Sequence, residues 1–187
     1  MPRKTSPKAA PKRLIVAITG ASGAIFGIRA LERLKDKEVE THLILSPSAL
    51  RTIKEETDYS APEVRGLASV VHSYEDIGAS MASGSFRTAG MLVAPCSIKT
   101  LSGIANSYND NLVVRSADVC LKDRRRLVLL LRETPLHLGH IELMERATRY
   151  GALVMPPVPA FHLKPRTIDD LVDQTVDRAL EPFGIAA

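Results

Sequence analysis

Cysteine is scarce in this 187-residue sequence and long apolar runs are absent, and each deficit excludes a class of protein. The two cysteines, Cys96 and Cys120, are too few and too irregularly spaced for a disulfide framework, and we expect both to be buried. No run approaches the roughly 20 apolar residues of a membrane-spanning helix, and no secretory signal is visible. The sequence therefore predicts one cytoplasmic domain with a full core and no membrane span.

Acidic residues are missing from positions 1–13, which hold five Lys or Arg and three prolines. Residues 14–187 hold 20 basic and 21 acidic residues, so the formal charge of +4 comes from this tail. We predict a disordered basic tail at 1–13 and a single α/β domain at 14–187. Organelle transit peptides also begin basic and acid-free, but this tail is short and cannot form an amphipathic helix. Nucleic-acid binding is excluded because the folded part is close to neutral.

Glycines follow the first predicted strand at once, in the stretch Leu14–Gly27, which reads LIVAITGASGAIFG. Residues 14–19 predict a short buried strand, and residues 24–34 have helical spacing. The glycines let the backbone approach a ligand closely, and Ser22 adds a hydroxyl. Because N–H groups in the first turn of a helix lack partners, this turn predicts a site for a nucleotide phosphate. Close packing of strand and helix is the alternative explanation of the glycines.

No acid follows the second predicted strand, Val39–Leu45. A dinucleotide site usually has Asp or Glu there, to hold the ribose hydroxyls. This strand ends instead in Ser46-Pro47-Ser48. A hydroxyl in that place suits a phosphate better than a ribose, so the pattern favours a mononucleotide such as FMN.

Strand and helix patterns alternate along the rest of the chain, which predicts a three-layer α/β fold with a mostly parallel sheet of about six strands. Further strands are expected at 70–72, 89–94, 127–131 and 152–155. Helices are expected at 49–56, 98–105, 112–122, 136–150 and 167–183, whereas 58–69 has no clear period. The small-residue loop at 77–86 is expected to be functional or mobile, with a plain surface connection as the alternative.

Hydroxylated and charged residues follow two of these later strands. One strand leads into the helix start Ser97–Thr100, where hydroxyls and Lys99 can offer donors to a ligand. The central strand ends in Arg132 and Glu133, in the place where open α/β sheets put their ligands. An exposed surface ion pair is the alternative for these two residues.

Three cations come from separate predicted elements, namely Lys122, Arg132 and Arg178. We hypothesise that they converge on an anion. Arg178 flanks the apolar face of the last helix, beside Leu171, so it need not point into bulk water. The three arginines at 124–126 are interpreted as a solvated face.

No metal site is predicted, although two patterns suggest one. Residues 169–173 spell D-D-x-x-D, which holds magnesium in helical prenyl-diphosphate enzymes, but Thr167 with Asp170 makes an ordinary helix start. His137 and His140 stand three apart on a predicted helix, and no Cys or acid at ligand spacing completes a tetrahedral site. No G-x-S-x-G or hydrolase triad is present either.

Seven blocks follow one another in order over about residues 13–185, and they read GASGAIFG, ASGSFRT, APCSIKT, RSADVCLKDRR, LLRETPL, GALVMPPVPAF and RALEPFG. Together they resemble the UbiX/Pad1 flavin prenyltransferases. The resemblance implies a flavodoxin-like homo-oligomer, a dodecamer in known members, that binds FMN and requires no metal. Such enzymes transfer a dimethylallyl group from dimethylallyl monophosphate to the flavin, and a UbiD-type decarboxylase receives the product.

The resemblance also implies roles for individual residues. It implies FMN contacts from Gly20, Ala21, Ser22, Ser46, Ser97, Ile98, Lys99, Thr100 and Arg132. It implies contacts to the prenyl phosphate from Arg115, Lys122, His162 and Arg178, and catalytic roles for Ser22, Glu56, Lys122 and Glu133. Fixed cations stabilise the charge that grows on a departing monophosphate, as magnesium does for diphosphates. An acid such as Glu133 can then take up or relay a proton.

Two positions depart from the family pattern. His162 stands where Tyr is usual, so an imidazole replaces a phenol donor, and Ser107 stands where Gly is usual, which we expect to be structural. Two rival functions stay open. One is an FMN-dependent decarboxylase of cysteine-containing substrates, which would need its own catalytic His and an Asn-containing loop. The other is a non-catalytic flavin carrier or accessory subunit of a decarboxylase complex, which would lose the phosphate-facing residues.

Overall fold

The sheet is organised around β1 (Lys12–Ile18), which pairs with β2 on one side and with β4 on the other in the computed structural model of residues 12–185. The pairings among these residues are all parallel, and the strand order is β3-β2-β1-β4-β5-β6. The chain winds outward from β1 to β3, returns to β4 and winds outward again, so its direction reverses between β1 and β4. The other strands are β2 (Val39–Leu45), β3 (Val70–His72), β4 (Gly90–Cys96), β5 (Arg126–Leu131) and β6 (Leu153–Val154).

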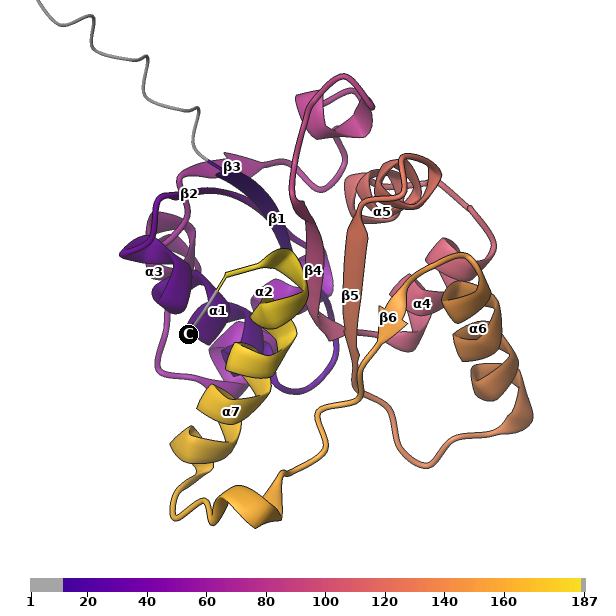
Figure 1. The fold of residues 1–187 in the computed structure, drawn as a ribbon. Coiled ribbons are helices and arrows are strands. Elements are labelled where there is room, and N and C mark those ends of the chain that lie inside the picture. Colours follow the sequence, from indigo (N-terminus) through magenta and orange to yellow (C-terminus); the bar gives the residue numbers. More distant parts are fainter. Residues whose placement is uncertain (1–11, 186–187) are drawn as a thin grey trace, which may run out of the picture.

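Helices cover both faces of the sheet, which confirms the predicted three-layer α/β architecture (Figure 1). One face carries α1 (Ala24–Lys35), α2 (Pro47–Glu56), α3 (Ala61–Gly66) and α7 (Ile168–Leu180). The other carries α4 (Ile98–Ala105), α5 (Leu112–Lys122) and α6 (Leu138–Arg149). Short 3₁₀ turns lie at η1 (Ser80–Ala82), η2 (Phe161–Leu163) and η3 (Glu181–Phe183). Within residues 12–185, no helix combines the length and the apolarity needed to cross a bilayer.

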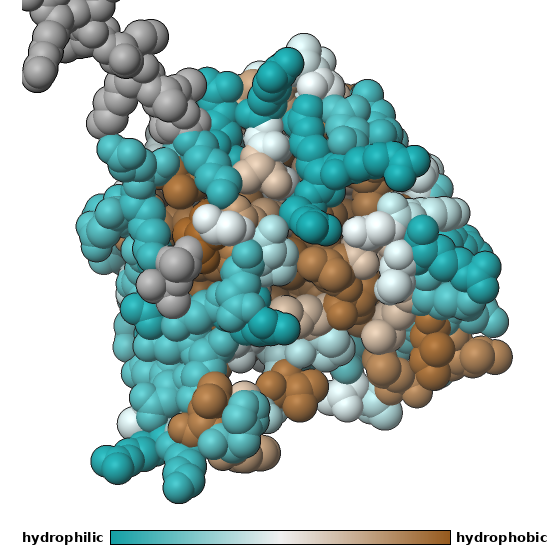
Figure 2. All heavy atoms as spheres, in the orientation of Figure 1, coloured by the Kyte–Doolittle hydropathy of each residue, from teal (hydrophilic) through white to brown (hydrophobic). Residues whose placement is uncertain are grey.

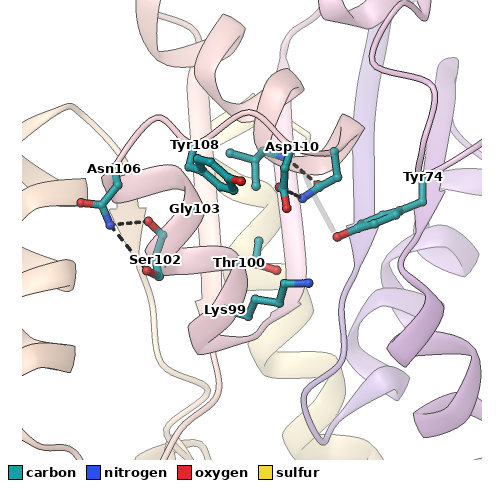
Figure 3. Close-up of a pocket in the computed structure, with 10 residues that line it drawn as sticks. Tyr74, Lys99, Thr100, Ser102, Gly103, Asn106, Tyr108 and Asp110 are labelled. Atoms are coloured by element: carbon teal, nitrogen blue, oxygen red, sulfur yellow. Dashed lines mark hydrogen bonds between the residues drawn. The ribbon is translucent and has the colours of Figure 1, made fainter.

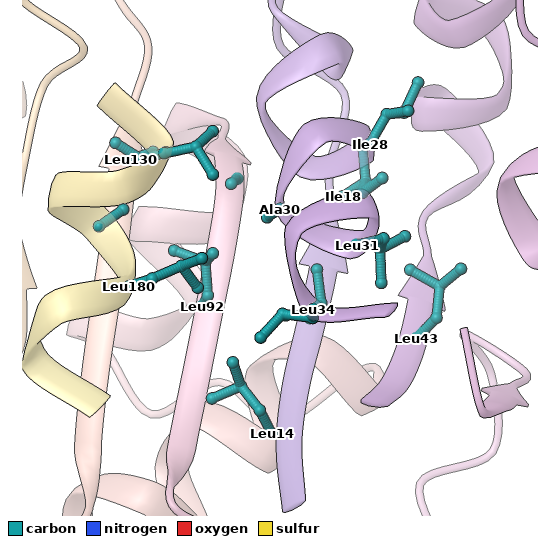
Figure 4. Close-up of a cluster of buried hydrophobic side chains, with 14 of the residues drawn as sticks. Leu14, Ile18, Ile28, Ala30, Leu31, Leu34, Leu43, Leu92, Leu130 and Leu180 are labelled. Carbon is teal, nitrogen blue, oxygen red and sulfur yellow. The ribbon is translucent and has the colours of Figure 1, made fainter. Parts of the chain in front are cut away.

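Side chains on the two faces of β1 enter two separate cores. Leu14 and Ile18 pack with Leu31 and Leu34 of α1 and with Leu180 of α7 (Figure 4). Alternation along a strand sends every second residue to the opposite face, where the second core contains the facing residues of α4, α5 and α6. Both faces of the central strands are therefore buried from solvent, as their apolar sequences predict.

Cys96 and Cys120 are buried in the second core, which confirms the expectation that both are small core residues. Burial raises the pKa of each thiol to about 12, because an apolar environment disfavours the thiolate. A thiol that stays protonated is a poor nucleophile. Neither cysteine is therefore suited to covalent catalysis.

The acids at the start of α7 serve the helix and its packing. Thr167 and Asp170 form a capping box, which confirms the predicted helix start. Asp169 and Asp173 pair with Arg29 of α1, the former at 2.8 Å, and so fasten α7 to α1. Among residues 12–185, no group of three or more His, Cys, Asp or Glu side chains is placed to hold a metal ion.

Several elements differ by one to three residues from the sequence-based expectation, and three differences have a clear cause or consequence. β1 begins at Lys12, so residues 12–13 of the predicted tail belong to the sheet, and the rest of that tail lies outside the described residues. β4 runs through Pro95 to Cys96, because its pairing with β5 resumes at Cys96 after an irregularity. The six-residue helix α3 was not predicted, because it is too short to show a period.

Ser107, in place of the usual Gly, has a left-handed φ of 51°, which fits a structural role.

A long loop between β3 and β4, residues 73–89 (hereafter the cover loop), is tied to α5 and to the turn after it. Arg125 donates to the carbonyls of Gly84 and Phe86 at 2.6 Å each, and its side chain is only 15% exposed. The interpretation of 124–126 as a solvated face is therefore wrong at Arg125. Met81 in the loop is fully buried, so the loop is part of the packed structure.

Candidate functional site

The first turn of α1 already binds an anionic side chain. The Gly23 N–H donates to Oε2 of Glu56 at 2.7 Å, and the Ala24 N–H lies 3.4 Å from the same oxygen. A phosphate in this position would compete for the same donors and would be repelled by the carboxylate. The carboxylate of Glu56 occupies these donors in this structure, and the phosphate site at this turn stays a prediction.

Gly20 in the same turn is required by packing. A Cβ on Gly20 would lie 2.2 Å from Cβ of Ser48, at the start of α2. The close-packing explanation of the glycines is thus correct for this position, while Ala21 and Ser22 form the rest of the turn above the end of β1. The turn brings Ser22 to the same end of the sheet as Glu56.

The start of α4 is a second helix N-terminus at this end of the sheet. Among the described residues, no carboxylate side chain accepts a hydrogen bond from its first N–H groups. Oγ of Ser97 caps the helix by accepting from the Thr100 N–H at 3.3 Å, and the two hydroxyls lie 3.1 Å apart. Ile98 and Lys99 complete the first turn, whose N–H groups and dipole favour an anion. The Arg132 N–H donates to the Cys96 carbonyl at 3.0 Å, which places the exposed Arg132 beside this turn.

Ser46 lies at the end of β2, one strand further along the same edge. Its Oγ caps α2 by accepting from the Ala49 N–H at 3.1 Å, and its own N–H donates to the Ile18 carbonyl. The side chain is almost fully buried at 7% exposed. The carboxyl ends of β1, β2, β4 and β5 therefore gather Ser22, Ser46, Ser97 and Arg132 at the point where the winding reverses.

Thr19 joins the two strand-to-helix turns, and the sequence analysis did not identify it. Its Oγ1 donates to the Pro95 carbonyl at 2.7 Å and accepts from the Ser97 N–H at 2.9 Å, and the residue is fully buried. The hydroxyl thus links the end of β1 to the cap of α4. A Thr directly before the glycine turn, at the end of an apolar strand, is the sequence signal that could have identified it.

Thr19→Val is expected to lower the free energy of unfolding by about 1–3 kcal/mol, because it leaves the partly buried Ser97 N–H without its acceptor and the Pro95 carbonyl without one of its donors. Urea unfolding measures this difference. Thr19→Ser keeps the hydroxyl and is the matched control, with a smaller loss from the missing methyl group. Equal stability of the Val variant and the natural protein would show that the two bonds contribute nothing.

Glu133 follows Arg132 and is half-buried. Its Oε1 accepts from the Thr134 N–H at 3.0 Å, which fixes the carboxylate near the end of β5. Backbone N–H groups thus hold both carboxylates. Glu56 is held by the turn after β1, and Glu133 by the turn after β5. Two oriented carboxylates can accept or relay protons.

His162 and Arg178 line one groove, of about 1060 Å³, between α7 and the segment after β6. Leu153, Met155 and Val158 contribute apolar walls. Arg178 pairs with Glu181, and its side chain is 72% exposed. We expected that Arg178 need not point into bulk water, but within one chain the last turn of α7 leaves it at the surface.

Arg115 and Lys122 lie seven residues apart on α5 and hence on one face of that helix. Arg115 donates to the Ala82 carbonyl and to Asp118, both at 3.2 Å, and Lys122 is half-exposed, with its Nζ 4.0 Å from Asp123. Lys122 is the last residue of α5, and β5 begins four residues later at Arg126, so Lys122 lies near the start of β5.

The hypothesis that Lys122, Arg132 and Arg178 converge is therefore wrong within a single chain. Arg132 follows the last residue of β5, whereas Lys122 precedes the first. Arg178 belongs to the end of α7, whose next segment brings Phe183 against Gly90 at the start of β4. Lys122 and Arg132 thus lie at opposite ends of β5, and the helices that carry Lys122 and Arg178 cover opposite faces of the sheet.

Lys99 and Thr100 also border a second hollow, of about 430 Å³, on the outer side of α4 (Figure 3). Tyr74 and Tyr108 stand at opposite sides of it in this view. Asn106 there donates to the Ser102 carbonyl at 2.7 Å. The hollow therefore lies between the start of α4 and the molecular surface.

His137 and His140 lie side by side at the start of α6. Nδ1 of His137 accepts from the Gly139 N–H at 3.1 Å and so caps α6, and the two rings lie 3.6 Å apart between centroids. Nδ1 of His140 is buried and has no hydrogen-bond partner among the described residues.

A parallel α/β sheet with a helix N-terminus at the point where its winding reverses is typical of nucleotide-binding proteins. In agreement with this, the protein family described as Flavoprotein matches residues 2–180 of the chain. The flavin prenyltransferase UbiX of Thauera aromatica is 59% identical over 173 residues, covering 92% of this chain and 89% of that protein. The flavin prenyltransferase UbiX of Escherichia coli K12 is 58% identical over 175 residues, 93% of each chain. The chain therefore belongs to the UbiX family of flavin prenyltransferases.

Solved structures agree with this assignment. The crystal structure of AnUbiX (PadA1) in complex with FMN and dimethylallyl pyrophosphate has a TM-score of 0.92 and 51% identity, covering 94% of this chain and 93% of that one. A dodecameric FMN-dependent UbiX-like decarboxylase from Escherichia coli O157:H7 has a TM-score of 0.91 and 49% identity, covering 94% and 95%. The cysteine decarboxylase TvaF, at 15% identity and a TM-score of 0.66, shares the fold alone.

Proposed function

We propose that this chain transfers a dimethylallyl group from dimethylallyl monophosphate to reduced FMN. The observation that carries the proposal is its high identity, over nearly the whole chain, to flavin prenyltransferases. The AnUbiX structure, which contains FMN and dimethylallyl pyrophosphate, supports both ligands. The roles of individual residues below are part of the same proposal.

The start of α4 suits the FMN phosphate, because it combines a helix N-terminus with hydroxyls and two cations. Ser97–Thr100, Lys99 included, supply the helix donors, and Arg132 and Ser46 lie along the same edge. Gly20, Ala21 and Ser22 at the neighbouring turn would then face the flavin ring. When bound, reduced FMN supplies the nucleophilic ring atoms, and the protein supplies binding and orientation.

The prenyl phosphate needs cations, because a monophosphate leaves poorly unless its growing charge is stabilised. One chain presents His162 and Arg178 in its groove and Arg115 and Lys122 on α5, too far apart to meet. We infer that these groups meet between copies, in a homo-oligomer. The dodecameric assembly of the Escherichia coli O157:H7 relative supports this inference.

Exposed apolar side chains also support a homo-oligomer. Figure 2 shows them gathered at the lower edge of one face, over the start of α6 and the segment around η2. Large exposed apolar patches commonly mark protein interfaces. The residues are Leu136, Leu138, Ile141, Val158, Phe161 and Leu163.

Proton handling is assigned to the acids. As the new carbon–nitrogen and carbon–carbon bonds close the added ring, a proton must leave the flavin, and we assign Glu133 to accept it. We assign Glu56, which accepts from the Gly23 N–H, and the neighbouring Ser22 to orient the reacting partners. No residue of the site is a nucleophile toward the prenyl group, since the flavin takes that role.

The product serves a UbiD-type decarboxylase in this proposal. Buried, unbridged cysteines fit a reducing compartment, so we place the enzyme in the cytoplasm. The proposal assigns no metal ion, because fixed cations take over its electrostatic role at the phosphate.

Mass spectrometry of the flavin tests the function. Protein mixed with reduced FMN and dimethylallyl monophosphate is expected to yield FMN heavier by one prenyl group, with release of phosphate. Bound but unmodified FMN would favour the flavin-carrier alternative, and carbon dioxide release from a peptide ending in cysteine would favour the decarboxylase.

His162→Tyr, which restores the usual phenol, is expected to retain product formation in the same mass-spectrometric assay.

A further inference from the structure

The cover loop takes the place of a helix over one part of the sheet. Helices α4, α5 and α6 cover one face of the sheet, and on the same face the loop packs against β2 through Phe86 and His42, with η1 packed against α5. Figure 1 shows the loop rising between β3 and β4, near α5. Tyr74, Ala79 and Phe86 of the loop pack on the second core. The loop therefore completes the layer on this face.

Beneath the loop lies a buried polar cluster that the proposed function does not use. His42 is 3% exposed, and its Nδ1 lies 3.0 Å from Nε2 of His72. Its Nε2 lies 2.9 Å from Oε1 of Glu40, which also accepts from Nε of Arg13 at 3.2 Å. Phe86 of the loop packs edge-on against the His42 ring at 5.0 Å between centroids. The guanidinium of Arg13 stands 4.8 Å from the Phe86 centroid, so the cluster directly supports the loop.

The bonds assign the protons of the two rings. A carboxylate only accepts, so Nε2 of His42 carries a hydrogen toward Glu40 and its Nδ1 must accept from Nε2–H of His72. A proton added to His72 goes to its free Nδ1 and leaves this bond intact. A proton added to His42 goes to Nδ1, where it faces the N–H of His72, so the two rings must separate or the His72 hydrogen must move to its own Nδ1. In either case a positive charge is placed on a ring that is 3% exposed, lies near Arg13 and is covered by Phe86 of the loop. Because opening the loop would let water reach this charge, protonation of His42 favours release of the loop.

We propose that the His42–His72 pair is a pH-sensitive latch that holds the cover loop while His42 is neutral and releases it when His42 gains a proton. The charged groups around the pair are Arg13 on β1, Glu40 on β2 and Asp76 in the loop. Asp123 and Arg125 act from the far side of the loop. Only the two imidazoles among them have an ordinary pKa near neutrality.

The direction of the pH effect follows from burial. Burial lowers the pKa of His42, against the opposing effect of Glu40, and burial together with the His42 charge lowers the pKa of His72. The unfolded rings have pKa values of about 6.5, so the unfolded or open chain takes up protons first as pH falls. The stability of the latch is complete above about pH 6.5 and is lost below it.

The latch also reaches the proposed site, because Arg115 donates to the Ala82 carbonyl within the loop. Release of the loop would free a side chain that the proposed function assigns to the prenyl phosphate. This consequence rests on the proposed function, whereas the latch itself does not.

Hydrogen–deuterium exchange of the full-length protein tests the latch. Between about pH 7.5 and 5.5, after correction for intrinsic exchange, protection of residues 73–89 is expected to fall on the order of tenfold. His42→Gln keeps a donor toward Glu40 and cannot titrate, so its loop protection is expected to stay constant. Constant protection in the natural protein, or an equal fall in His42→Gln, would overturn the proposal.

A second measurement needs no variant. Imidazole chemical shifts followed by NMR are expected to give apparent pKa values below about 6.5 for both rings, with loop release following the His42 titration. Loop protection that stays unchanged while His42 titrates refutes the latch. Loop release in a protein that makes no prenylated flavin at any pH refutes only the proposed function.

Discussion

Lys122→Ala is expected to reduce prenyl transfer about 100- to 1000-fold, because it removes a cation aimed at the departing phosphate. FMN is expected to stay bound, since Lys122 lies at the opposite edge of the sheet from the α4 helix start. Rates of flavin mass change and retained flavin absorbance measure the two properties. Lys35→Ala is the matched control, because Lys35 is likewise a lysine in the last turn of a helix and plays no part in the site.

Mixed oligomers give this prediction a sharper form. Lys122→Ala and Arg178→Ala proteins are each expected to be nearly inactive. When the two are dissociated, mixed and reassembled, some sites receive Lys122 from one copy and Arg178 from another, and activity is expected to return. Mixtures that stay as inactive as the parents would contradict a site shared between copies, and full activity of either parent would remove that cation from the mechanism.

Glu133→Gln is expected to lower turnover about 100- to 10,000-fold, the usual contribution of a positioned acid or base. The amide keeps the shape and can still accept from the Thr134 N–H, so FMN binding and stability are expected to change little. Single-turnover kinetics separate chemistry from binding. Loss in kcat with an unchanged KM for the prenyl phosphate is the expected result.

Glu142→Gln on the exposed side of α6 is the control for the charge change at Glu133. If Glu133→Gln retained full turnover, the proton would have to go elsewhere, with Glu56 the remaining oriented carboxylate. If the variant lost FMN instead, Glu133 would be part of the binding site and not a proton acceptor.

The fold could be predicted because its signals are local. Val39–Leu45 was predicted to the residue, since its apolar end Leu43–Leu45 is followed directly by the helix cap Ser46. Ile98–Ala105 and Leu112–Lys122 were equally clear. α3 was missed because a capping box followed by six residues carries no period. The ends of β4 were uncertain because Pro95 usually interrupts a strand.

The site could be predicted only in part. Strand ends meet at one edge of a parallel sheet, so Ser46, Ser97 and Arg132 could be grouped from topology alone. Glu56 could not be placed, because its reach to the Gly23 N–H depends on how α2 packs. The position of Lys122 could have been inferred, since a helix that leads into a parallel strand ends beside the start of that strand.

The two outermost strands have a consequence for how copies of this chain associate. β3 has three residues and β6 only two, so neither margin offers a row of free backbone groups long enough to recruit another chain. Association of copies by continuing the sheet of one chain into the sheet of the next is therefore disfavoured. Any ordered assembly of this protein has to be made by side chains on helices and loops, which leaves its geometry open to adjustment by single surface substitutions.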